Sequence, residues 1–128
     1  MDTTAPLGGA PRSVLSEDHE MFRTQVRRFF EREIVPFHRE WERAEIVPRE
    51  VWRKAGAEGL LCPMLAEEYG GAGADFGYSA VILEEIARTN ASGIGFPLHS
   101  DIVVPYVEAL ARPEKKREWL PRMAKGEI

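Results

Sequence analysis

Apolar side chains recur every three or four residues along most of the chain, which is the spacing of one helix face, and no stretch alternates as a strand does. The first such stripe follows Ser16, which suits a helix N-cap, and His19 occupies the position where a full capping box has glutamate. Pro36 is expected to end or kink this helix, because proline lacks an amide proton and clashes with the preceding turn. The stripe comprises Phe22, Val26, Phe29, Phe30 and Ile34.

The rest of the chain predicts further helices separated by proline, glycine and short polar breaks. After Pro36 we expect a helix that carries Phe37 and Trp41, and then helices over 48–58, 93–100, 101–111 and 114–124. The residues expected to face inward from 101–111 are Ile102, Val103, Tyr106, Val107 and Leu110. Together these segments predict an all-α bundle of about five to six helices.

A glycine-rich turn and the helix after it, residues 67–88, form the most informative stretch. Asp75 suits the N-cap of that helix, which is apolar on nearly all sides, so we expect the other helices to cover it. The turn predicts positive φ angles and close backbone approach. A nucleotide site is disfavoured there, because the glycine spacing does not match, no apolar strand precedes the turn, and Asp75 would occupy the phosphate position.

Two adjacent carboxylates, Glu84 and Glu85, interrupt the apolar helix. One of them could be an acid with a raised pKa. However, adjacent residues on a helix point about 100° apart and cannot act as a facing pair. We therefore favour ion pairs to neighbouring helices or domains, with Arg88 as one partner for Glu84.

The same stretch carries a family resemblance. The turn Glu67-Glu68-Tyr69-Gly70-Gly71-Ala72-Gly73, followed by the Glu84-Glu85 helix, resembles the N-terminal helical domain of acyl-CoA dehydrogenases. The segment 116–127 is similar to the family's sequence just before its flavin-binding barrel. The resemblance spans about residues 15–128, with one departure at Ala66, where relatives usually have proline.

The resemblance implies an FAD-dependent enzyme that dehydrogenates an acyl-CoA thioester between its α and β carbons. Its electrons would pass to an electron-transfer flavoprotein, and its assembly would be a homotetramer or dimer. The catalytic carboxylate lies in the family's C-terminal helical domain, so no catalytic residue is expected here. We interpret residues 1–14 as a disordered lead and 15–128 as the N-terminal domain. With the middle β-barrel and C-terminal domain absent and Ile128 a truncation point, the fragment is expected to be inactive alone.

One apolar helix is the candidate site. In the family, the corresponding region lines the far end of the acyl-chain cavity. The matching positions are Gly95, Leu98, His99 and Ile102, which would leave depth, supply an apolar wall and place one polar group. The alternative is that these residues make ordinary core contacts.

The composition and charge of the chain restrict the kinds of binding partner and the cellular location that we expect. A net charge of −4 argues against nucleic acid, and no apolar run approaches the roughly 20 residues of a membrane span. The single Cys62 favours a buried structural thiol over a nucleophile. His19 and His38 are expected on the surface, and no histidine has metal-ligand spacing. The N-terminus lacks the pattern of a secretory signal or transit peptide, which favours the cytoplasm.

Two other functions stay open. A helical interaction module without chemistry would keep the fold and bind no flavin. A flavin-dependent acyl-CoA oxidase or monooxygenase shares the helical domain, and an oxidase would release peroxide. Residues that contact flavin cannot be assigned from this stretch.

Overall fold

The computed structural model describes residues 14–128 as helices joined by turns, and no strand occurs in this part of the chain. This confirms the all-α prediction. The predicted disordered lead, residues 1–14, lies almost wholly outside the described residues. The elements are α1 (Glu17–Glu33), α2 (His38–Ala44), α3 (Arg49–Ala57), η1 (Glu67–Tyr69), α4 (Phe76–Thr89), η2 (Ser92–Ile94), η3 (Leu98–Val103), α5 (Val104–Leu110) and α6 (Pro113–Ala124).

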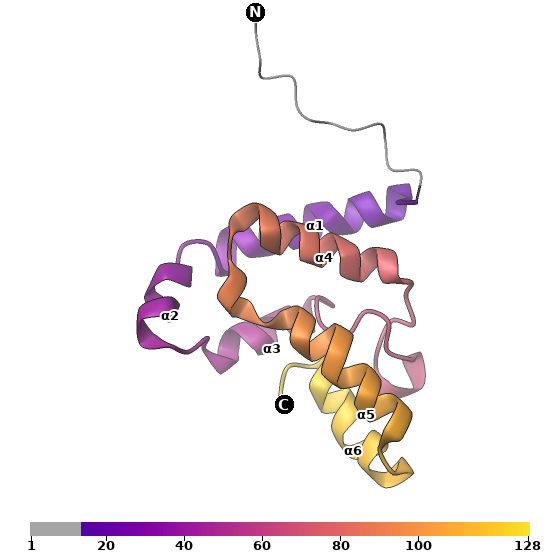
Figure 1. Cartoon of the computed structure of the whole chain (residues 1–128). Coiled ribbons are helices and arrows are strands. Elements are labelled where there is room, and N and C mark those ends of the chain that lie inside the picture. The colour runs from indigo at the N-terminus through magenta and orange to yellow at the C-terminus, as the bar shows by residue number, and fades with distance from the viewer. Residues whose placement is uncertain (1–13) are drawn as a thin grey trace, which may run out of the picture.

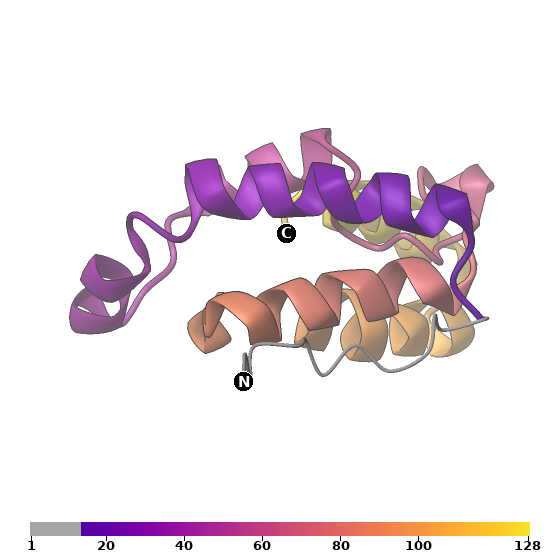
Figure 2. The same ribbon diagram turned by 90° about the horizontal axis from the view of Figure 1, so that it is seen from above.

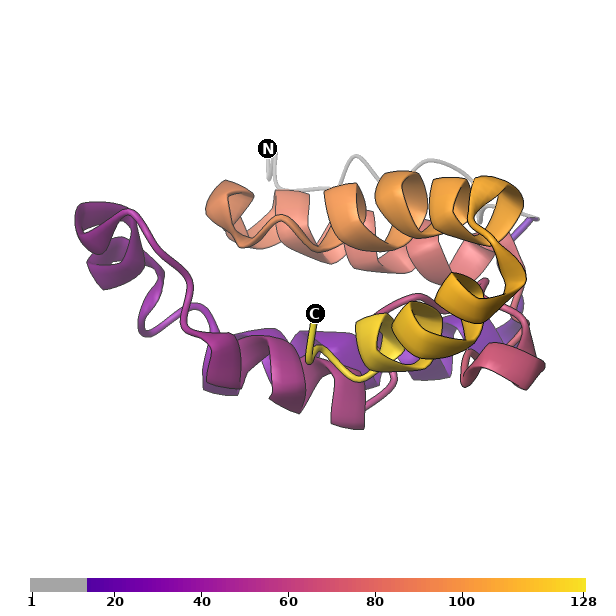
Figure 3. The same ribbon diagram turned by 90° about the horizontal axis from the view of Figure 1, so that it is seen from below.

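The helices lie in two layers, with α2 projecting at one end (Figure 1). Figure 2 shows α1 running alongside α4, and the view from below in Figure 3 shows α1, α3 and α6 on one side and α4 with α5 on the other. The core lies between the layers, and α1 contributes two of its largest fully buried side chains, Phe29 and Phe30. The fully buried side chains of this helix and its C-cap are Val26, Phe29, Phe30 and Ile34.

The predicted central position of α4 is wrong. Among its apolar side chains only Val81 and Ile82 are buried, whereas Phe76 is 58% and Leu83 is 38% exposed. An apolar sequence indicates that several faces of a helix would be more stable out of water. A face is buried, however, only where another element packs against it. Within residues 14–128, α4 has α1 along one face and leaves part of its apolar surface uncovered.

The start of α1 is fixed by a buried histidine rather than by a surface one. The Ser16 amide donates to His19 Nδ1 at 2.8 Å, and the His19 amide donates to the Ser16 hydroxyl oxygen. His19 thus completes the capping box in place of glutamate. Because Nδ1 accepts, Nε2 carries the proton and donates to Asp75, the N-cap of α4, at 2.7 Å.

His38 is also buried, again contrary to the surface prediction. Its Nε2 accepts from the Gly93 amide at 3.2 Å, which joins α2 to η2. Each ring accepts a hydrogen bond from a backbone amide, His19 from Ser16 three residues away and His38 from Gly93 in a distant segment. Sequence spacing alone does not reveal the partners that are distant in the chain, Asp75 for His19 and Gly93 for His38.

The predicted break between Ser100 and Asp101 does not occur. Helix continues from η3, which is a π-helix, into α5, and the first break follows Leu110. Pro105 cannot donate a helical hydrogen bond, and a π-turn before it is one way in which a helix accommodates proline.

This wider turn changes which residues face inward. Of the positions expected to face inward, Val107 alone packs against the core, and Val104 is the buried residue of α5. The four that are exposed instead are Ile102, Val103, Tyr106 and Leu110.

Two adjacent valines test this register. Val104→Ala should lower the free energy of unfolding by about 2 kcal/mol, because it removes methyl groups from a packed site. Val103→Ala should change it by less than about 0.5 kcal/mol, because that side chain is already partly in water. Urea denaturation of both variants measures the difference, and equal losses would contradict the register.

Candidate functional site

The π-helix η3 is held in place by three polar side chains. His99 Nε2 donates to the Met123 carbonyl of α6 at 3.0 Å, because a carbonyl oxygen can only accept. The buried Ser100 hydroxyl oxygen accepts from the Cys62 amide at 2.9 Å. Asp101 accepts from the Ser79 hydroxyl of α4 at 2.7 Å. η3 is therefore tied to both layers of the fold.

The four predicted site residues divide into two pairs. Gly95 has φ +73° and lies near Trp52, and the His99 ring meets the edge of Trp52 with ring centroids 5.3 Å apart. Leu98 and Ile102 instead are 59% and 51% exposed. The structure brings Gly95 and His99 to one tryptophan and leaves Leu98 and Ile102 on the surface of η3.

A cavity of about 530 Å³ opens beside His99 between α3 and the end of the chain. Trp52 forms its aromatic wall and also contacts Phe96, with ring centroids 4.8 Å apart. Sequence reasoning missed Trp52, since an aromatic residue on an amphipathic helix carries no sign of which distant residues it meets. The lining residues are Arg49, Trp52, His99, Arg122, Gly126, Glu127 and Ile128.

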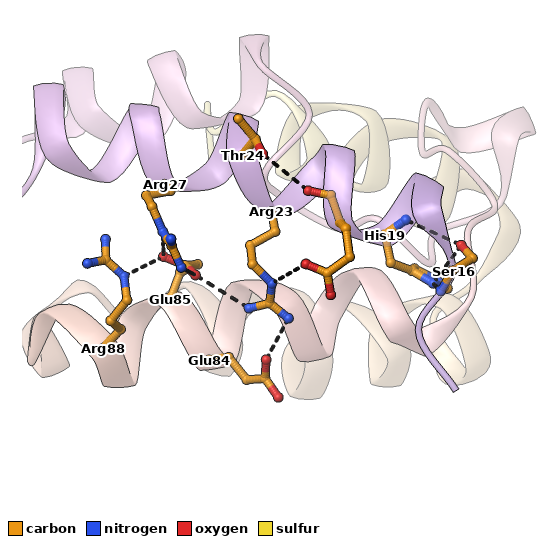
Figure 4. Close-up of polar contacts among 9 residues, drawn as sticks. Ser16, His19, Arg23, Thr24, Arg27, Glu84, Glu85 and Arg88 are labelled. Atoms are coloured by element: carbon orange, nitrogen blue, oxygen red, sulfur yellow. Dashed lines mark hydrogen bonds and ion pairs between the residues drawn. The ribbon is translucent and has the colours of Figure 1, made fainter. Parts of the chain in front are cut away.

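The two glutamates of α4 form ion pairs with arginines, as expected (Figure 4). Glu85 is only 1% exposed in its side chain and lies 2.8 Å from both Arg27 and Arg88. Burial acts to raise the pKa of Glu85, but hydrogen bonds from these arginines outweigh it and hold the pKa at about 2. The alternative of a general acid with a raised pKa is therefore wrong for Glu85.

The neighbouring carboxylate has a different partner from the one expected. Glu84 binds Arg23 of α1 at 2.7 Å, and Arg88 binds Glu85 rather than Glu84. Arg23 also approaches Glu85 at 3.4 Å, so the arginines of α1 join both carboxylates to the neighbouring helix. This arrangement fixes α4 against α1.

The glycine-rich turn is a structural turn, as predicted. Gly70 and Gly73 have φ angles of +91° and +57°, and the Gly73 amide donates to the Leu65 carbonyl at 2.8 Å. Asp75 accepts from the Gly77 amide at 2.8 Å, so a carboxylate already occupies the N-terminus of α4. The turn therefore does not fit a flavin phosphate.

The remaining candidate groups are the Cys62 thiol and the metal-ligating side chains. Burial raises the pKa of the Cys62 thiol to about 11, so the thiol is protonated at neutral pH and the structural interpretation is confirmed. Across residues 14–128, no group of three or more metal-ligating side chains is assembled. In the same part of the chain, no helix combines the length and apolarity that crossing a bilayer requires.

Comparison with known proteins gives a consistent result. The family model described as "Acyl-CoA dehydrogenase, N-terminal domain" matches residues 16–127. The long-chain specific acyl-CoA dehydrogenase of Rattus norvegicus mitochondria is 46% identical over 115 residues, covering 90% of this chain and 27% of the relative.

Solved structures show the same relationship. An acyl-CoA dehydrogenase from Geobacillus kaustophilus matches with a TM-score of 0.85 and 45% identity, over 91% of this chain and 30% of that one. An acyl-CoA dehydrogenase complexed with FAD from Bacillus anthracis matches with a TM-score of 0.75 and 30% identity, over 92% and 20%. The chain thus spans less than a third of the length of these relatives.

Proposed function

Because this chain belongs to the acyl-CoA dehydrogenase family through its N-terminal domain, we propose that it is part of an FAD-dependent enzyme that dehydrogenates acyl-CoA thioesters. In this proposal the domain covers the acyl-chain end of the substrate pocket. The structural observation that supports this role is the way η3 is anchored and which of its side chains are exposed. Three polar side chains anchor the π-helix, while Leu98 and Ile102 present apolar surface outward.

Each predicted site residue then has a distinct role. Leu98 and Ile102 form an apolar wall against the chain, because fatty acyl groups are recognised mainly by apolar contact. Gly95 leaves space where a side chain would approach Trp52. His99 positions η3 through its hydrogen bond to Met123. It therefore affects the acyl group indirectly, by setting where the apolar wall lies.

The reacting groups lie outside the described residues in this proposal. FAD supplies the hydride acceptor in the complete enzyme, and residues 14–128 hold no flavin site at the glycine turn, where Asp75 occupies the helix N-terminus. The base, the electron-transfer flavoprotein as electron acceptor and a homotetramer or dimer are all part of the proposal for the whole protein. A cytoplasmic location stays a prediction.

A chimaeric enzyme tests the role of the wall. Residues 16–127 would replace the corresponding segment of the Geobacillus kaustophilus acyl-CoA dehydrogenase, and kcat/KM would be measured over a series of acyl-CoA chain lengths. Leu98→Ala with Ile102→Ala should shift the preference toward longer chains by about 10-fold, because each lost wall group deepens the pocket. His99→Ala should also change the profile, through displacement of η3.

Leu110→Ala is the control, since it removes another exposed leucine, 76% exposed against 59% for Leu98, from the end of α5. A chimaera that binds flavin and whose chain-length profile is the same in all four proteins would contradict the assignment. Peroxide release during turnover by a native full-length protein would instead favour an acyl-CoA oxidase.

A further inference from the structure

The charges of the chain are divided unevenly between one hairpin and the rest. The basic hairpin, defined as residues 104–125, comprises α5, the turn and α6 with the residue after it. It contains six lysines and arginines and three glutamates, a net charge of +3. The whole chain carries −4, so the remaining residues carry −7. This uneven distribution of charge produces an electrostatic field that orients the hairpin toward negatively charged surfaces.

Most cations of the basic hairpin are free to meet an external partner. Lys115 pairs with Glu118 and Arg122 with Glu127, and both pairs lie at the surface, where they are weak. The other four form no salt bridge with any carboxylate of residues 14–128. They are Arg112, Lys116, Arg117 and Lys125.

Apolar side chains accompany these cations at the hairpin turn. Leu110, the last residue of α5, is 76% exposed and lies two positions before Arg112. Tyr106, one turn earlier, is 66% exposed, and Trp119 of α6 lies under Lys115, whose ammonium is 5.2 Å from the ring centroid. Basic residues beside aromatic and leucine side chains are typical of elements that bind at a bilayer interface.

We propose that the basic hairpin binds the surface of bilayers that contain anionic phospholipid, with Leu110 and Tyr106 in the headgroup region. The hairpin turn lies at the end of the molecule away from α1 (Figure 1). A projecting turn offers little of the area that a stable protein interface buries, whereas a deformable bilayer accepts it without a complementary shape. This inference is independent of the enzymatic proposal, because it uses none of the proposed acyl-wall residues.

Vesicle co-sedimentation of the 128-residue chain tests the proposal. Binding to phosphatidylserine-containing vesicles is expected, with little binding to pure phosphatidylcholine, and it should weaken as salt rises from about 0.05 M to about 0.5 M. Each basic residue near such a surface contributes about fivefold in affinity. Arg112→Glu with Arg117→Glu should therefore reduce binding at least about 20-fold.

The matched control is Arg39→Glu with Arg43→Glu on α2. Arg39 and Arg43, like the hairpin's Arg112 and Arg117, are exposed and form no salt bridge within residues 14–128. The two double variants change the net charge of the chain by the same amount. The α2 variant should bind as the unmodified chain does. Equal losses in the two variants would show a net-charge effect and overturn the assignment to the hairpin.

Leu110→Ser separates lipid from a soluble acidic partner. Its binding to vesicles should fall about fivefold, because a leucine no longer enters the interface. Unchanged vesicle binding by Leu110→Ser, together with equal affinity of the chain for polyglutamate, would favour an acidic protein and overturn the lipid proposal. Absence of binding to phosphatidylserine vesicles at low salt would also overturn it. Circular dichroism checks that each variant keeps its helices.

Discussion

Replacing Gly71 by alanine should lower the free energy of unfolding by about 3 kcal/mol, one of the largest single-residue effects expected in this chain. A methyl group at Gly71 would overlap the backbone carbonyl of Leu65, along with its Cβ. Backbone cannot move aside as a flexible side chain can, and the Leu65 carbonyl also accepts the Gly73 amide. Relief of the overlap would therefore disrupt the whole glycine-rich turn before α4.

Gly59→Ala is the control for this substitution. Gly59 has φ +75° but no atom within 4 Å of an added methyl group, so alanine there meets only backbone strain of about 1–2 kcal/mol. Denaturant unfolding measures the free energy of unfolding of both variants, and so compares the cost of steric overlap at Gly71 with the cost of φ strain at Gly59. A Gly71→Ala loss no larger than that of Gly59→Ala would contradict the close approach to Leu65.

Replacing Glu85 by glutamine should destabilise the domain by at most about 3 kcal/mol at neutral pH. The depression of its pKa from 4.5 to about 2 corresponds to that free energy. Glutamine keeps the shape of the side chain but leaves Arg27 and Arg88 without their buried negative partner. The value is an upper limit because both arginines are partly in water.

The pH dependence of this effect has a definite sign. A carboxylate whose pKa is lower in the folded state stabilises above its unfolded pKa, and that contribution is lost as the pH falls through the folded pKa. The difference between the unmodified chain and Glu85→Gln should therefore be full above about pH 5 and should shrink toward pH 2. Urea unfolding at several pH values measures it, with Glu84→Gln, which alters a more exposed carboxylate, as the control. A difference independent of pH between 5 and 2 would contradict the assignment.

Local sequence signals predicted several helix ends correctly, although the predicted end at Ser100 does not occur. Ser16 and Asp75 lie at the predicted caps, and Pro36 separates α1 from α2. These signals depend on residues within one turn of each other, so they can be recognised without knowledge of the fold. The same holds for the glycine-rich turn.

Features that depend on distant partners could not be predicted in this way. The exposed face of α4 depends on which helices pack against it, and the register of α5 depends on a π-turn that no local pattern specified. At the candidate site, the sequence indicated the helix that carries His99 but not Trp52, which comes from α3. The roles of Gly95, Leu98, His99 and Ile102 toward an acyl chain stay predictions.

The hydrogen-bonded chain from Ser16 through His19 to Asp75 has a consequence for sequence variation. One imidazole completes the cap of α1 and binds the cap of α4, so neither helix end is chemically independent of the other. A family member with glutamate at position 19 would regain the usual capping box but would place a second carboxylate against Asp75. Positions 19 and 75 should therefore change together among close homologues, with a carboxylate at 75 retained only where a hydrogen-bond donor occupies 19.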